Sequence, residues 1–105
     1  MSIKGVLKEE LDNSKSLVKR YDEELEKLPK GSLIKKAIRG HLYYYIVMRD
    51  EGKVRFEYMG KEVSQKVVQE YAQAKKMRAK YRELRSKAKK QINFLERALR
   101  EQKSI

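Results

Sequence analysis

The chain has 105 residues, a length that suits one compact domain and is too short for two cores of ordinary depth. Lys and Arg number 27 against 15 acidic residues, which gives a formal net charge of +12 and favours a polyanionic partner such as nucleic acid. The absence of cysteine excludes disulfides, thiolate metal sites and thiol catalysis, and it agrees with a reducing compartment.

No segment has the hydropathy of a signal peptide or of a membrane span. The first residues lack the apolar run of a signal peptide, and nowhere do about 18 apolar residues follow one another. The sequence therefore predicts a cytoplasmic protein with no membrane partner. Its apolar residues recur at regular intervals, which favours a folded chain over a disordered one.

Residues 3–28 have the pattern of an amphipathic helix. Spacings of four and three residues alternate along one stripe, formed by Leu7, Leu11, Ser14, Val18, Tyr21, Leu25 and Leu28. Pro29 lacks an amide donor and disfavours helix in the residue before it, so we expect the helix to end near Leu28.

Residues 32–60 change to a period of two, which is typical of half-buried strands. Apolar residues occupy even positions in both 41–49 and 53–59: Leu42, Tyr44, Ile46, Met48, Val54, Phe56 and Tyr58. The segment Asp50-Glu51-Gly52 predicts a hairpin with a three-residue loop. Residues 33–38, joined through a turn at Arg39-Gly40, complete a predicted three-stranded antiparallel meander.

Residues 64–102 contain no Pro or Gly and predict a long second helix with Ser64 as its N-cap. Its apolar stripe is Val67, Tyr71, Ala74, Met77, Tyr81, Leu84, Ala88, Ile92, Leu95 and Leu99. Because this helix is longer than the first, either the two pack antiparallel with a basic overhang, or a second copy of the chain completes a helical bundle. The expected fold is α+β, in a single domain over residues 1–105.

The second helix carries the strongest functional signal. Nine of the sixteen residues from Lys75 to Lys90 are basic, against one acid, Glu83. The nine are Lys75, Lys76, Arg78, Lys80, Arg82, Arg85, Lys87, Lys89 and Lys90. Neutralising phosphates releases condensed counterions, so this basic segment is predicted to bind DNA or RNA in a salt-dependent way. The alternative is a charged helix surface that serves solubility.

The predicted sheet offers a second candidate surface. If the even positions of both strands are buried, the other face carries aromatic and basic residues together: Tyr43, Tyr45, Arg49, Lys53 and Arg55, with Lys35 and Arg39 on the first strand. Tyr can stack on exposed bases and Arg can bind phosphate or guanine, so this face is predicted to contact nucleic acid. The alternative is that the tyrosines pack against a helix.

The sequence shows no catalytic, metal or cofactor site. His41 is the only histidine, the acidic residues between positions 9 and 26 lack the spacing of a metal site or a catalytic carboxylate pair, and the glycines form no phosphate-binding loop. A protein that is not an enzyme is therefore predicted.

Three segments resemble a pattern of small uncharacterised proteins from bacteria, archaea and their mobile elements. They are Leu28-Pro29-Lys30-Gly31-Ser32-Leu33, Gly40-His41-Leu42-Tyr43-Tyr44-Tyr45 and Gly52-Lys53-Val54-Arg55-Phe56-Glu57-Tyr58-Met59-Gly60-Lys61. The Tyr-rich strand and the segment after it are also similar to parts of some transposases and to the DNA-binding sheets of certain integrases. The integrase resemblance implies that Tyr43, Tyr45, Arg49, Lys53 and Arg55 lie on a DNA-contacting face; it implies no recombination activity, because the sequence lacks a catalytic domain.

These observations predict a nucleic-acid-binding protein that uses the basic segment and the sheet face. A second hypothesis is a phage or mobile-element protein of the anti-CRISPR type, which docks on an acidic protein or on a nuclease–nucleic-acid complex. A third is a homo-oligomeric coiled-coil scaffold held together by the two helix stripes.

Overall fold

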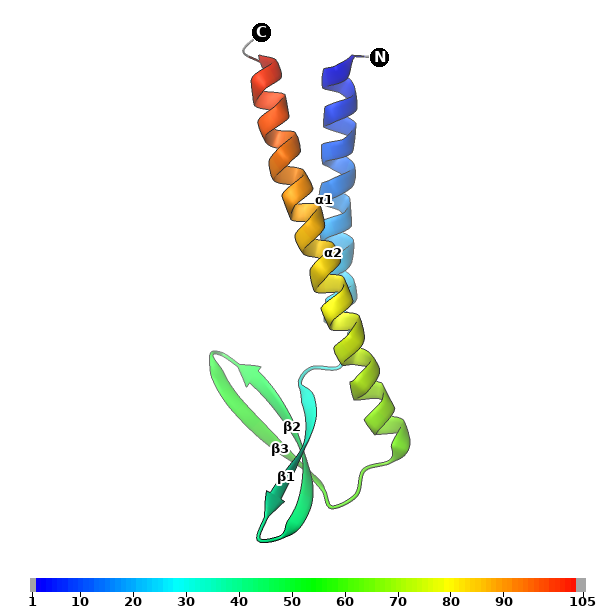
Figure 1. Cartoon of the computed structure of the whole chain (residues 1–105), viewed down its shortest axis with the longest axis vertical. Helices are drawn as coiled ribbons and strands as arrows, with labels where there is room; N and C mark the ends of the chain where they lie inside the picture. Colours follow the sequence, from blue (N-terminus) through cyan, green and yellow to red (C-terminus); the bar gives the residue numbers. More distant parts are fainter. Residues whose placement is uncertain (1, 104–105) are drawn as a thin grey trace. The chain divides into compact units, whose positions relative to one another are not determined.

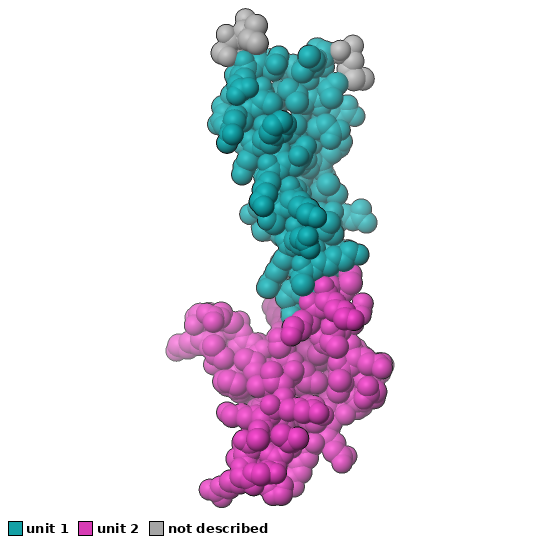
Figure 2. Space-filling view, viewed as in Figure 1, with its two compact units in different colours: residues 1–27, 78–105 teal, residues 28–77 magenta. Residues whose placement is uncertain are grey.

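A computed structural model describes residues 2–103 and contains two helices and three strands (Figure 1). In chain order they are α1 (Ile3–Lys27), β1 (Ser32–Ile38), β2 (His41–Asp50), β3 (Lys53–Gly60) and α2 (Gln65–Lys103). The predicted α+β fold is thus confirmed. The chain forms two compact units, residues 1–27 with 78–105 and residues 28–77, and α2 contributes to both (Figure 2). The assignment of residues 1–105 to a single domain stays a prediction.

In the first unit, α1 lies antiparallel to residues 78–103 of α2 (Figure 1). The predicted stripes form the contact: Ser14, Ala88 and Leu95 are buried, and the ring centroids of Tyr21 and Tyr81 lie 6.1 Å apart. The Oγ of Ser2 accepts a hydrogen bond from the amide of Gly5 at 3.0 Å, which caps the start of α1. The antiparallel arrangement of the two predicted helices is therefore present within one chain.

In the second unit, the strands form an antiparallel sheet of order β1-β2-β3, as predicted. Both turns have two residues of positive φ: Arg39 (51°) with Gly40 (80°), and Glu51 (49°) with Gly52 (79°). Two such residues define a turn whose twist matches that of the flanking strands. Asp50 therefore pairs directly with Lys53, and the loop between them has two residues, not the predicted three.

The shorter loop changes which side chains share a face of the sheet. Tyr45 lies opposite Tyr58 and Val47 opposite Phe56, so the even positions of β3 lie on the same face as the odd positions of β2. A shift of one residue in register moves every side chain of a strand to the other face.

The predicted common face of Tyr43, Tyr45, Arg49, Lys53 and Arg55 is therefore wrong. Lys53 and Arg55 lie on the opposite face from the other three residues. The first strand also differs from the expectation, because Lys35 lies opposite Tyr44 and Lys36 lies opposite Tyr43. Arg39 lies in the turn between β1 and β2.

One face of this sheet is partly buried on β1 and β2, whereas residues 53–59 of β3 are exposed. Ile46 is 4% exposed, and Leu33, Tyr44 and Met48 on the same face are half-buried. The same compact unit contains the beginning of α2, where Ser64 acts as the predicted N-cap and its Oγ accepts a hydrogen bond from the amide of Val67 at 3.3 Å. In this part of α2 the predicted stripe is the less exposed side, and Ala74 is buried.

Gly31 allows the chain to enter β1 while lying against β2. Its φ is +89°, and a Cβ at this position would lie 2.7 Å from the carbonyl oxygen of Val47 and 2.8 Å from Cγ2 of Ile46. Both the backbone conformation and the space therefore require glycine.

We expect Gly31→Ala to destabilise the protein more than Gly40→Ala. Gly40 has a similar φ of +80° but no atom within 4 Å of an added Cβ. Its replacement by Ala should therefore lower the free energy of unfolding only by the cost of a side chain in the left-handed conformation, about 1–2 kcal/mol. The clash at Gly31 adds about 1–3 kcal/mol. Urea unfolding followed by circular dichroism measures both variants, and equal losses would contradict this account of Gly31.

Candidate functional site

The face of the sheet opposite Ile46 is rich in aromatic rings and open to solvent. We call it the aromatic face and define it by Lys36, Tyr43, Tyr45, Phe56 and Tyr58, which the strand pairing places on one side. Phe56 is 54% exposed and Tyr58 is 55% exposed. A contiguous patch of exposed apolar rings marks an interaction site on a protein surface.

The four rings form one contiguous cluster across β2 and β3. The ring centroid of Tyr45 lies 5.5 Å from that of Tyr58 and 6.5 Å from that of Phe56, and the centroids of Tyr43 and Tyr58 are 6.1 Å apart. The ring planes meet at 58°, 85° and 57° respectively. The rings therefore pack tilted or edge to face rather than in parallel stacks.

The aromatic face is positively charged. The Nζ of Lys36 lies 5.1 Å from the ring centroid of Phe56 and 5.9 Å from that of Tyr45, within the range of a cation–π interaction. Arg49 adds a second cation on this side of β2.

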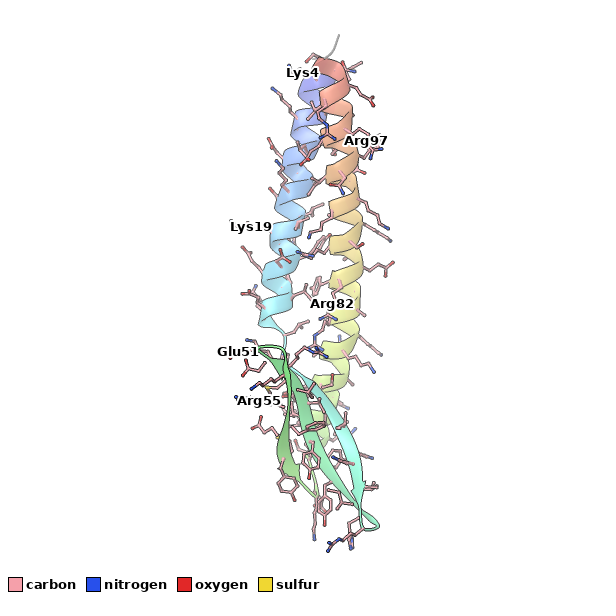
Figure 3. The ribbon with its side chains drawn as sticks, turned by 90° about the vertical axis from the view of Figure 1, so that its left-hand side faces the viewer. Lys4, Lys19, Glu51, Arg55, Arg82 and Arg97 are labelled. Carbon is pink, nitrogen blue, oxygen red and sulfur yellow. The ribbon has the colours of Figure 1, made fainter. Side chains whose placement is uncertain are left out.

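The acidic strand residues lie on the other face of the sheet, where both are exposed. Glu57 is the pairing partner of Ile46, and Asp50 is paired with Lys53. The carboxylate of Asp50 also forms an ion pair with Arg55, with 3.6 Å between Oδ2 and Nη1, near the hairpin tip at Glu51 (Figure 3). The four clustered rings thus lie on the opposite face from the strand carboxylates, whereas Tyr44 shares the face of those carboxylates.

The sequence analysis missed Lys36, Phe56 and Tyr58 as members of this face, because it placed Phe56 and Tyr58 on the buried side. A two-residue turn ending in Gly is the common alternative to the predicted three-residue loop. Assigning Glu51-Gly52 to a two-residue turn gives the observed pairing of Tyr45 with Tyr58.

The basic segment of α2 is mostly exposed. Arg78 and Arg85 are half-buried, and the other seven basic residues are exposed. Arg85 donates a hydrogen bond from Nε to the carboxylate of Asp22 on α1, and Lys87 pairs with Glu83 one turn away, with 3.4 Å between Nζ and Oε1.

The remaining cations are not neutralised by the carboxylates of the chain. Within residues 2–103, six of the nine form no ion pair: Lys75, Lys76, Lys80, Arg82, Lys89 and Lys90. Successive helix residues are about 100° apart, so the nine basic residues form two stripes that flank the apolar stripe. The cations are therefore distributed over the solvent side of α2 and are not gathered on one face.

A groove in the first unit brings several of these cations together. It has a volume of about 450 Å³ and is lined by Asp22 and Leu25 of α1 and by Arg82, Arg85, Ser86, Lys89, Lys90 and Asn93 of α2. Figure 3 labels Arg82 on this helix. Four cations thus face one carboxylate, and the hydroxyl and amide groups add hydrogen-bond donors. Arg, Lys, Ser and Asn are the side chains that most often bind phosphate oxygens.

The described residues contain no group of three or more Asp, Glu or His side chains placed to hold a metal ion. A search of the same residues found no helix with the length and hydropathy needed to cross a membrane.

This chain belongs to the family described as Domain of unknown function (DUF6788), whose sequence model matches residues 6–70. No curated protein and no solved structure matches the chain. The matched residues include the whole aromatic face and end before Lys75. The aromatic face therefore lies in the part of the chain that the family shares, whereas the basic segment lies outside it.

Proposed function

We propose that this protein binds nucleic acid without catalysing a reaction, and that the basic segment of α2 is its main contact with phosphate. The supporting observation is that six of its nine cations have no ion-pair partner within residues 2–103. Keeping like charges this close on one helix is unfavourable in the free protein. A phosphate backbone removes that repulsion and releases its own counterions on binding.

The groove beside Asp22 supplies the most concentrated set of phosphate contacts. Arg82, Lys89 and Lys90 line it without an ion pair among the described residues, and Ser86 and Asn93 lie beside them. An anion in the groove would be held by charge and by directed hydrogen bonds together, which is the stronger form of phosphate contact.

The resemblance to transposase and integrase segments supports the same proposal and adds a mobile-element context to it. The proposed cytoplasmic location agrees with the absence of cysteine. The alternative partner is an acidic protein, which would use the same cations. Purification from cells with and without nuclease treatment separates the two: loss of the bound material after nuclease treatment supports nucleic acid, and a retained acidic protein opposes it.

We expect the triple variant Arg82→Glu, Lys89→Glu and Lys90→Glu to lose nucleic-acid binding strongly. Each lost phosphate contact lowers the slope of log affinity against log salt by about 0.7–0.9, so the slope should fall by about two to three. Fluorescence anisotropy with a labelled 30-mer, titrated between about 50 and 200 mM salt, measures both affinity and slope.

The matched control is Lys4→Glu, Lys8→Glu and Lys15→Glu. These residues are exposed on α1 in the same unit, and the change in net charge is identical. Equal losses in the two triple variants would show that only total charge matters. An undetectable affinity of the unmodified protein at the lower salt concentration would refute the proposed function.

We expect Asp22→Asn to strengthen binding by about fivefold, because it releases Arg85 to phosphate and one such contact is worth about 1 kcal/mol. The control is Glu83→Gln, which frees Lys87 from an exposed pair away from the groove lining and raises the net charge equally. The same anisotropy titration compares them. Equal gains in both variants would argue against a specific role of the groove.

A further inference from the structure

We infer that the aromatic face binds single-stranded nucleic acid by stacking unpaired bases on its rings. This inference rests on the proposed function and specifies the class of nucleic acid. It is carried by the contiguous cluster of Tyr43, Tyr45, Phe56 and Tyr58, with Lys36 among the rings.

Stacking distinguishes single strands from duplexes. A base inside a duplex is covered on both sides by its neighbours, whereas an unpaired base offers a π face to a protein ring. Aromatic stacking platforms flanked by cations are the common solution for single-strand binding, and loss of one ring typically costs about 5- to 150-fold in affinity. The exposed rings of Phe56 and Tyr58, at 54% and 55%, meet this requirement.

The charge of the face favours a nucleic acid strand over a second copy of the chain. The strand residues that share this side include Lys36 and Arg49, and the strand carboxylates Asp50 and Glu57 lie on the other side. In a symmetric dimer the same patch meets itself, so these cations would be brought together and desolvated without partners. A phosphate backbone is complementary to them.

The register also argues against reading a duplex through this sheet. The DNA-contacting face that the integrase resemblance implies needs Lys53 and Arg55 beside Tyr43 and Tyr45, and the observed pairing places both cations on the opposite face of the sheet. Arg55 is moreover paired with Asp50. Rings predominate on the exposed side, and rings read the faces of bases rather than their edges.

The first test uses the absence of tryptophan from the chain. Phe56→Trp introduces a single indole on the aromatic face, and Phe94→Trp introduces one at the other phenylalanine, which is 63% exposed on α2. We expect an unstructured oligo(dT) to quench the fluorescence of the Phe56→Trp protein strongly and that of the Phe94→Trp protein weakly. A duplex of equal length should quench both weakly.

The second test measures affinity. The double variant Phe56→Leu and Tyr58→Leu keeps apolar side chains on β3 but removes two rings, and Phe94→Leu is its control. We expect a loss of at least tenfold for single strands in the double variant and a change below about twofold for the duplex. Circular dichroism establishes that both variants are folded before binding is measured.

The outcomes separate this inference from the proposed function. If the unmodified protein binds no nucleic acid at low salt, both fail. If it binds in a salt-dependent way, but quenching is equal at the two positions and the double variant keeps its single-strand affinity, only this inference fails. If light scattering shows a dimer that the double variant loses, a second copy occupies the face and the inference is overturned.

Discussion

The register between β2 and β3 determines the surface chemistry of the second unit, and it depends on the left-handed conformation of two successive residues, Glu51 and Gly52. Because both have positive φ, Asp50 lies opposite Lys53 and the rings of Tyr45 and Tyr58 come together. A loop one residue longer would place Phe56 and Tyr58 on the opposite face from Tyr43 and Tyr45. The ring cluster therefore follows from the geometry of one turn.

Features that depend on local sequence could be predicted, and the register could not. The helix stripes, the N-cap at Ser64, the end of the first helix before Pro29 and the strands themselves follow from spacing over a few residues, and the structure has all of them. The faces of β3 depend on whether Asp50 belongs to the loop or to the strand. Both assignments put Gly52 at a left-handed position, so the glycine alone does not decide between them.

The chain keeps few large side chains in its interior. Among the side chains that the structure describes, only Ser14, Ile46, Ala74, Ala88 and Leu95 are buried, and three of these are small. Small residues let helices approach closely but contribute little hydrophobic free energy, which scales with the apolar area removed from water. Both phenylalanines and Tyr58 lie exposed instead. The ring contacts of Phe56 and Tyr58 across the strands support the sheet, so aromatic variants need a folding control alongside any binding measurement.

The two candidate surfaces suit different features of a nucleic acid. In the proposed function, the cations distributed over the solvent side of α2 contact phosphates, and phosphate contacts position a protein without reading sequence. Rings on the sheet accept any base that is free to stack, so they respond to whether a strand is paired and tolerate every sequence. A protein with both surfaces would distinguish single strands from duplexes far better than one sequence from another. Binding to a particular site of a nucleic acid would then depend on unpaired segments that are exposed there, and not on the edges of paired bases.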